Sequence, residues 1–467
     1  MFVKKVKWAV ALLACSLLLC ACGENVNQVQ SGEETEPASV DSLTENSDTI
    51  SAIDMEPIPV EDFFKLQVVE DGKTSFKVVR SDDASDEVSV AAIHLRKAIN
   101  AITGANVGIT SDLAKTQENA KEIVVGSSNR TEAQAFQATL TGYSFGIKIT
   151  ENRILIVATH EDFVPLAVDY FMEHYLVNGD YVEIGEGTFS ISSAAGVICS
   201  GERADLTNIR ENTNYATLSE LVANIPKEGN FKALQGGCVT EDYAYMAVLN
   251  TTDYDTKDAG CYIYKLSTKT WKIIKRSKVL MLAHANDMTY NPNNNMLYVA
   301  HCYVDSTAIS LIDADTLELV ETIHTDSGVY AIDYHAATNT FVGGQGKSGT
   351  IFFRFANNNT SKLITSGKIT ATSTQMVTQG ICRDDNYVYH VMFSTAADEP
   401  YNTIIIYDLE SKKLAHYVRL SISGQEPENI SLVNGEFYIG CNSSTTQLDI
   451  YKSVLYEFDF DACVPCP

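Results

Sequence analysis

The sequence predicts a multidomain chain, in which an α/β sandwich domain precedes an all-β five-bladed β-propeller. Two observations lead to this prediction. In residues 61–198, helical and strand patterns alternate, whereas from residue 232 helical periodicity disappears and short runs rich in Tyr, Val, Ile and Phe recur between Asn, Asp, Gly and Ser. In addition, about 400 residues follow the N-terminal segment, which is too many for a single hydrophobic core.

The first 22 residues have the pattern of an export signal. Three lysines precede an apolar run at residues 8–21, which is too short to span a bilayer as a mature helix. The run ends in LCACG at residues 19–23, which resembles the lipobox of bacterial lipoproteins. This resemblance implies that Cys22 is lipidated, with palmitate among the acyl chains, and that the exported chain is anchored to the bacterial cell membrane. An ordinary signal peptide cleaved after Ala21 is the alternative.

Residues 23–60 are predicted to form a disordered acidic tether. They contain nine acidic residues and neither Lys nor Arg, so they cannot bury enough apolar surface to offset the entropy of ordering. The formal net charge of the whole chain is −26, which argues against nucleic acid as a partner and against direct adsorption to anionic lipid.

The first folded part, residues 61–198, shows strands and helices in a definite order. A helix is expected to begin at Asp86 and to end at Thr103-Gly104, and a hairpin is expected around the Glu151-Asn152 turn. The segments AITGANVGIT, EIVVGSSNRTE and GYSFGIKITENRILIVA follow one another in this region. Their order and spacing resemble the non-catalytic N-terminal domain of bacterial α-glucuronidases and β-hexosaminidases. The resemblance implies an α/β accessory domain in a carbohydrate-related protein, and it implies no reaction.

The second folded part, residues 232–467, consists of five similar units. Their third strands align at the positions Tyr264, Ile312, Phe353, Tyr407 and Tyr456, which are 41 to 54 residues apart. Several of these strands are followed by a turn and a fourth strand. Four short strands repeated at this interval are typical of a β-propeller.

The fifth unit lacks a fourth strand of its own, which would leave an open sheet edge. We therefore predict that a segment of residues 203–228, within the connector at residues 199–231, pairs with residues 453–460 and closes the ring. Apart from Thr217–Val222, which could form a short helix, the connector has little pattern.

The segments that begin the first strand of each unit carry polar residues at the same level. The predicted ring and the polar residues beside it, taken together as a ligand-binding site, are Gln235, His284, Asn286, Asp287, Tyr330, Gln379, Glu426 and Glu428. Such side chains commonly pair with free backbone groups in propeller loops, which would be a structural role. The same ring could instead bind a sugar, a peptide or a small metabolite at the channel mouth.

Catalysis at the ring is a further alternative. Asp287 with Glu428 or Glu426 could supply the two carboxylates of a glycoside hydrolase, and His284 could act as the general base of a lyase. The sequence TQGI at residues 378–381 echoes a short motif of propeller glutaminyl cyclases, but the flanking motifs of that family are absent. No spacing of His, Cys or carboxylates predicts a metal site, and no cofactor motif is present.

Eight cysteines follow the lipobox, and their spacing leaves the disulfide pattern open. The CxxC pair Cys463 and Cys466 has no second pair and no βαβ context, so a local disulfide or free thiols are expected in place of a redox or zinc site.

Taken together, the sequence predicts a cell-surface lipoprotein that recognises an extracellular ligand, with a glycan favoured by the resemblance of the N-terminal domain. Two alternatives remain at this point: a glycoside hydrolase or polysaccharide lyase, and a protein-interaction scaffold.

Overall fold

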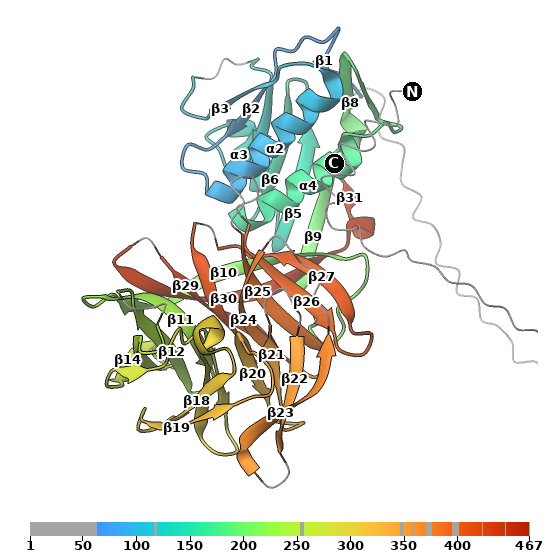
Figure 1. Cartoon of the computed structure of the whole chain (residues 1–467). Coiled ribbons are helices and arrows are strands. Elements are labelled where there is room, and N and C mark those ends of the chain that lie inside the picture. The colour runs from blue at the N-terminus through green and yellow to red at the C-terminus, as the bar shows by residue number, and fades with distance from the viewer. Residues whose placement is uncertain are drawn as a thin grey trace, which may run out of the picture.

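The computed structural model describes residues 63–115, 119–252, 256–345, 350–356, 359–369, 376–394, 401–422, 424–443 and 445–466 (Figure 1). The predicted signal peptide, lipidated Cys22 and acidic tether lie outside these residues. None of the helices within the described ranges is long and apolar enough to cross a membrane.

The N-terminal region contains a mixed sheet with the strand order β9-β5-β6-β4-β2-β3 and a small sheet with the order β1-β8-β7. The strands of the mixed sheet are β2 (Lys77–Arg80), β3 (Gly108–Ser111), β4 (Glu122–Val125), β5 (Tyr143–Ile149), β6 (Arg153–Ala158) and β9 (Val197–Arg203). The small sheet comprises β1 (Lys65–Val69), β7 (Val182–Gly185) and β8 (Thr188–Ser192). The helices of the region are α2 (Asp86–Thr103), α3 (Thr131–Gln137) and α4 (Val164–Tyr175).

Helix α2 has the bounds that the sequence predicts, and its ends show why. The hydroxyl of Ser85 accepts a hydrogen bond from the backbone N–H of Val88, which caps the first turn. Gly104 has a φ of 70°, a left-handed conformation that ends the helix at low cost only for glycine. Between these ends, Leu95 and Ile99 lie one turn apart on the buried face.

The C-terminal region is mostly β and propeller-like, as predicted, and consists of five groups of four strands that we call sheets 1 to 5. Sheet 1 comprises β11 (Phe231–Val239), β12 (Tyr243–Asn250), β13 (Gly260–Ser267) and β14 (Lys272–Arg276), with β15 (Leu280–Met281) beside β13. Sheet 2 comprises β16 (Asp287–Asn291), β17 (Met296–Ala300), β18 (Ala308–Asp313) and β19 (Leu319–His324). Sheet 3 comprises β20 (Ala331–His335), β21 (Thr340–Gly344), β22 (Thr350–Ala356) and β23 (Asn359–Ile369). Sheet 4 comprises β24 (Met376–Arg383), β25 (Tyr387–Ser394), β26 (Thr403–Asp408) and β27 (Lys413–Arg419).

Sheet 5 takes its fourth strand from the connector. It comprises β28 (Glu426–Val433), β29 (Glu436–Asn442), β30 (Gln447–Phe458) and β10 (Asn214–Pro226). Strand β10 pairs antiparallel with β30 from Asn214 opposite Phe458 to Pro226 opposite Gln447, which confirms the predicted partner strand. The predicted short helix at Thr217–Val222 is wrong, because these residues belong to β10 and their backbone groups bond to β30.

Each sheet shares a hydrophobic core with the next one, and sheet 5 shares a core with sheet 1. The core between sheets 1 and 2, for example, joins Ile263 to Val299. The core between sheets 5 and 1 joins Leu448 and Ile450 to Leu234. The other three cores join sheets 2 and 3, sheets 3 and 4, and sheets 4 and 5. The contacts therefore follow one another in a cycle.

Strand β30 also joins the two regions of the chain. In addition to β10, it pairs with β9, where Phe458 lies opposite Gly201. Strand β9 in turn pairs with β5 of the N-terminal sheet. The ring of Phe458 is fully buried in the N-terminal core. A salt bridge of 2.7 Å between Arg419 of β27 and Asp169 of α4 adds a second contact. Figure 1 shows β9 between the two regions, and β10 and β30 at the side of the C-terminal region that lies next to the N-terminal one.

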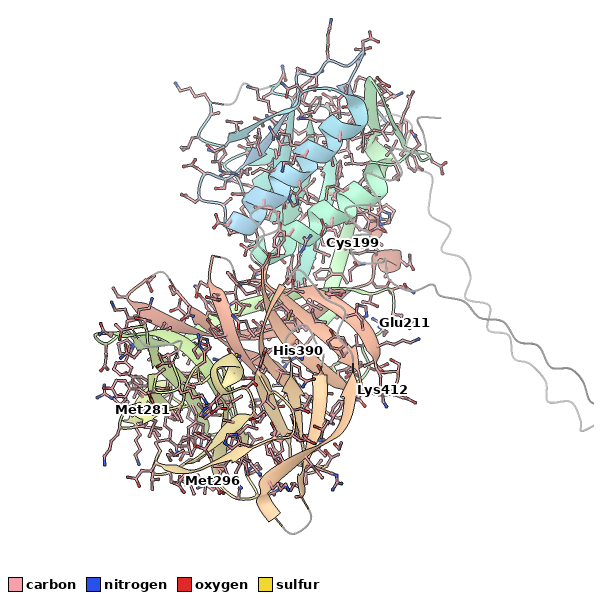
Figure 2. All side chains as sticks on the ribbon, in the orientation of Figure 1. Cys199, Glu211, Met281, Met296, His390 and Lys412 are labelled. Carbon is pink, nitrogen blue, oxygen red and sulfur yellow. A yellow bond between two sulfur atoms is a disulfide. The ribbon has the colours of Figure 1, made fainter. Side chains whose placement is uncertain are left out.

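A disulfide holds the C-terminal segment to β9. It joins Cys199 to Cys463, 264 residues apart in sequence, whereas Cys466 is a free thiol (Figure 2 labels Cys199). The expectation of a local Cys463–Cys466 disulfide is wrong. Residues 464–465 form a short strand, β31 (Val464–Pro465), on β9, and Cys463 packs on one side of the sheet while Cys466 packs on the other.

The carboxyl group of Asp162 lies where the N-terminal region meets β10, and it yields a testable pH dependence. Burial and then the charge of Glu87 raise the pKa of this carboxyl group to about 7, while the backbone of Ser219 and the side chain of Ser421 act in the opposite direction. The folded chain therefore keeps a proton that the unfolded chain releases above a pKa of 3.8. The stability that this group contributes is present at low pH and is lost as the pH rises towards 7.

Asp162→Asn should consequently raise the free energy of unfolding by an amount that grows between pH 4 and pH 7 and reaches about 2 kcal/mol at pH 8, after allowance for partial exposure. Urea unfolding of the full chain at pH 4 and pH 8 measures this difference. Asp258→Asn, at an exposed site, serves as the control and should change little at either pH. An equal effect of Asp162→Asn at both pH values would contradict the assignment.

Candidate ligand-binding site

Three predicted ring positions lie in β-bulges of the first strands of their sheets. In β11, Leu234 pairs with Val248 and Gly237 pairs with Met246, so this stretch of β11 contains one residue more than the stretch of β12 opposite it. Gln235 lies within this stretch. Corresponding irregularities occur at Gln379 in β24 and at Glu428 in β28. A bulge bends its strand and redirects a side chain, and bulges are frequent beside binding and active sites.

A glycine follows the glutamine in two of these bulges, and its lack of a side chain is required by close packing. A Cβ atom on Gly236 would lie 2.6 Å from the carbonyl carbon of Asp287. A Cβ atom on Gly380 would lie 2.5 Å from the Cα atom of Asn429. Both contacts are with backbone atoms of another first strand, which cannot swing aside. The repeated Gln-Gly pair thus lets first strands of different sheets approach one another closely.

Asp287 links three sheets. It is fully buried, and its Oδ1 accepts from the N–H of Met288 at 2.9 Å. Its Oδ2 accepts from the N–H of Ile332 in sheet 3 at 2.9 Å and from that of Ile381 in sheet 4 at 3.2 Å. Burial raises the pKa of Asp287 well above its usual range, although the hydrogen bonds from the three backbone N–H groups act in the opposite direction. With both oxygens occupied by backbone amides, this carboxyl group acts as a structural link and not as a group free to meet a substrate.

Two further side chains of the ring join neighbouring sheets through backbone groups. The Nδ2 of Asn286 donates to the carbonyl of Tyr330 in sheet 3 at 2.7 Å. The Nδ2 of Asn429 donates to the carbonyl of Gln235 in sheet 1, also at 2.7 Å. Asn286, Asp287 and Asn429 are therefore used to hold sheets together, as the structural alternative predicts.

Glu426 and Glu428 form the part of the ring that is not used in this way. Glu428 is 3% exposed and accepts a hydrogen bond from Nδ2 of Asn442. Glu426 is half-buried and accepts from Nε2 of Gln379 at 3.2 Å. Burial raises the pKa of both carboxyl groups, and the charge of Glu426 raises that of Glu428 further. A proton is thus held more readily at Glu428 than at an ordinary glutamate.

His284 lies in a backbone segment with unusual dihedral angles. Its neighbours Ala283 and Ala285 have φ values of 50° and 45°, and both are fully buried. A left-handed conformation costs a residue with a side chain about 1–2 kcal/mol, and such conformations gather at functional sites. The histidine side chain itself is half-buried. The segment next to Asn286 and Asp287 is therefore held in a costly backbone conformation.

The predicted site residues fall into two groups by exposure. Those that are half-buried are His284, Tyr330 and Glu426, which we call the rim. Those that are at least nine-tenths buried are Gln235, Asn286, Asp287, Gln379 and Glu428, which we call the floor.

Three residues of the cluster were not among the predicted ones. Asp333 accepts hydrogen bonds from the hydroxyl of Thr289 in sheet 2 and from the N–H of Arg383 in sheet 4. Asn429 and Asn442 make the contacts described above. Asn429 forms a polar pair with Glu428, as Asp287 does with Asn286, but both members of the Asn286-Asp287 pair reach another sheet, so such a pair does not by itself single out Asn429. Asp333 and Asn442 lie in strand patterns without a distinguishing signal.

The histidines outside the ring have structural contacts. The Nε2 of His390 lies 3.1 Å from the hydroxyl of Thr350 in the neighbouring sheet, and burial lowers the pKa of His390 to about 4 (Figure 2 labels His390). His301 likewise contacts the hydroxyl of Ser310 at 2.8 Å. In the part of the chain that the structure describes, no group of three His, Cys, Asp or Glu side chains is placed to hold a metal ion.

Comparison with known proteins gives only distant similarities to solved structures. No family model and no curated protein matches the chain. Among solved structures it is similar to the glutaminyl cyclase of Myxococcus xanthus, at 8% identity over 53% of this chain and 100% of that one, with a TM-score of 0.37. It is also similar to the β-propeller domain of Cps50 (Swd1) from Myceliophteria thermophila, at 9% identity over 48% of this chain and 65% of that one, with a TM-score of 0.28. Hydrazine synthase of Kuenenia stuttgartiensis matches at 11% identity over 46% of this chain and 57% of that one, with a TM-score of 0.29.

Proposed function

We propose that the chain is a bacterial cell-surface lipoprotein that binds an extracellular carbohydrate at the part of its polar ring around Glu426 and Glu428. In this proposal sheets 1 to 5 are the blades of a closed five-bladed β-propeller, and the N-terminal region is an α/β accessory domain. The cyclic order of the shared cores supports the closed propeller. The lipobox-like residues 19–23 support surface anchoring.

The observation that carries the binding proposal concerns the hydrogen-bond partners of the carboxyl groups of Glu426 and Glu428. Unlike Asp287 and Asn429, these carboxyl groups make no hydrogen bonds to backbone amides among those that the described residues show. Carboxylates and amides held in fixed positions are suited to the neighbouring hydroxyl groups of a sugar. The resemblance of the N-terminal region to accessory domains of carbohydrate-active enzymes favours the same ligand class.

A glycoside hydrolase or lyase is the second candidate, and one observation favours it. Glu428 is deeply buried beside a second carboxyl group, and this is the environment that keeps one carboxylic acid protonated while another is charged. Asp287, the other acid considered for this chemistry, is occupied by backbone amides.

Glycan-array binding by the full chain, combined with a reducing-end assay on the bound glycans, tests these candidates. We expect binding without release of reducing ends, and we expect Glu426→Gln and Glu428→Gln to weaken binding at least about tenfold. Glu410→Gln, at an exposed turn, is the matched control and should leave binding unchanged. Binding that survives both ring variants would refute the site, and new reducing ends would favour the enzyme.

A further inference from the structure

Asn442 joins the two glutamates of the proposed site to the backbone of sheet 1. It is the last residue of β29 and lies directly opposite Glu426 in the pairing of β28 with β29. Residues opposite one another on neighbouring antiparallel strands have adjacent side chains. The Nδ2 of Asn442 also donates a hydrogen bond to Oε1 of Glu428. These contacts place one amide group beside both carboxyl groups.

The orientation of the Asn442 amide is fixed by the backbone of Leu234 in sheet 1. The N–H of Leu234 donates to Oδ1 of Asn442 at 2.7 Å, and the carbonyl of Leu234 accepts from Nδ2 at 3.3 Å. The oxygen and nitrogen of an asparagine amide are told apart by their hydrogen-bond partners, and here both partners agree. Because Oδ1 is held by the N–H of Leu234, Nδ2 is the end of the amide that reaches Glu428.

The same hydrogen bond distinguishes the two oxygens of Glu428. Its Oε1 is occupied by Nδ2 of Asn442, whereas Oε2 accepts no hydrogen bond from the residues that the structure describes. Both oxygens of a carboxylate can accept hydrogen bonds. One oxygen of Glu428 is therefore used to hold the group in place, and the other is left for a ligand.

We infer that Asn442 is a positioning residue of the proposed carbohydrate site, where it holds the carboxyl group of Glu428 so that Oε2 meets the ligand. This inference rests on the proposed function. Asn442 acts through Glu428, and it makes the position of that carboxyl group depend on the contact between sheets 5 and 1. A carboxyl group that is held in this way before the ligand arrives loses less conformational freedom on binding, which favours affinity.

A pH profile of binding separates this role from a purely structural one. Burial and then the charge of Glu426 raise the pKa of Glu428, and the hydrogen bond from Asn442 acts in the opposite direction. Loss of the Asn442 amide should therefore raise the pKa of Glu428 further. The midpoint of the pH dependence of binding should move to higher pH whether the charged or the protonated form of Glu428 binds, because the midpoint follows the pKa in both cases.

Glycan-array binding by the full chain, recorded in steps from pH 4 to pH 9, measures the affinity and this midpoint together. In Asn442→Ala, we expect the glycans that bind the wild-type chain to bind at least about tenfold more weakly, with a midpoint about one pH unit higher. Asn442→Asp keeps an acceptor for the N–H of Leu234 but removes the donor to Glu428. It should show the same two effects, and it provides the test where Asn442→Ala is unstable. Circular dichroism and thermal unfolding establish that each variant is folded.

Asn429→Ala is the matched control. Asn429 also joins sheet 5 to the backbone of sheet 1, through the carbonyl of Gln235, but among the described residues it makes no hydrogen bond to either glutamate. Its replacement should lower the thermal stability, as Asn442→Ala does, and leave the pH midpoint unchanged.

Two results would overturn the inference while carbohydrate binding stands. One is a shift of the midpoint in Asn429→Ala as large as that in Asn442→Ala. The other is wild-type affinity and an unchanged midpoint in a folded Asn442 variant. If the wild-type chain binds no glycan on the array, the proposed function itself fails, and the inference fails with it.

Discussion

Replacing Gly380 by alanine is expected to destabilise the folded chain by about 3 kcal/mol or more. The added Cβ would lie 2.5 Å from the Cα atom of Asn429 and 2.8 Å from the backbone nitrogen of Ile430. Both atoms belong to the backbone of β28, so relief requires moving a whole strand that also packs in the core between sheets 4 and 5. Urea unfolding followed by circular dichroism gives the change in the free energy of unfolding.

Gly179→Ala provides a control with the same chemical change, because no atom lies within 4 Å of a Cβ at that position. It should alter stability by less than about 1 kcal/mol. If Gly380→Ala proves as mild as this control, β24 and β28 do not approach one another as described. Where Gly380→Ala fails to fold, the smaller expression yield relative to Gly179→Ala is the readout.

The second large effect is expected from Asp287→Ala. This change leaves the N–H groups of Ile332 and Ile381 buried without an acceptor, and each such loss costs about 1–3 kcal/mol. We expect a total loss of about 3–5 kcal/mol in the free energy of unfolding. Asp287→Asn keeps one acceptor oxygen and should cost less.

Stability and binding respond differently if Asp287 is a structural link. Any folded Asp287→Asn protein should retain glycan affinity, whereas Glu428→Gln should lose affinity with little loss of stability. Thermal unfolding and titration of the same preparations make the comparison. A stable Asp287→Ala protein that has lost all binding would instead place Asp287 in contact with the ligand.

Local patterns in the sequence predicted much of the fold. Ser85 and Gly104 mark both ends of α2, and the alternation around Tyr264 and its counterparts identified strands in every sheet. The missing fourth strand of sheet 5 pointed to the connector because an open edge is unfavourable. The prediction of a short helix at Thr217–Val222 failed. The residue pattern there suits a helix or a strand equally, and the pairing with β30 makes the segment a strand.

The candidate site was predicted less completely, for a physical reason. A bulge adds one residue to a strand without a distinctive sequence, so the sequence could not decide which of Glu428 and Asn429 reaches the neighbouring sheet. The partner of Cys463 was equally hidden, since Cys199 is 264 residues away. The distinction between Asp287, which holds sheets together, and Glu428, which remains available, depends on hydrogen-bond partners that only the folded chain brings together.

The pairing of β10 with β30 has a consequence for synthesis on the ribosome. Strand β10 leaves the ribosome before every other strand of sheets 1 to 5, and its partner β30 follows after roughly 220 further residues. At the usual rate of roughly 5–20 residues per second, β10 would wait about 10–45 s with an unpaired edge. During that interval the nascent chain carries an open strand that invites wrong partners. A factor that shields residues 214–226 until the last strand arrives would therefore raise the yield of folded protein.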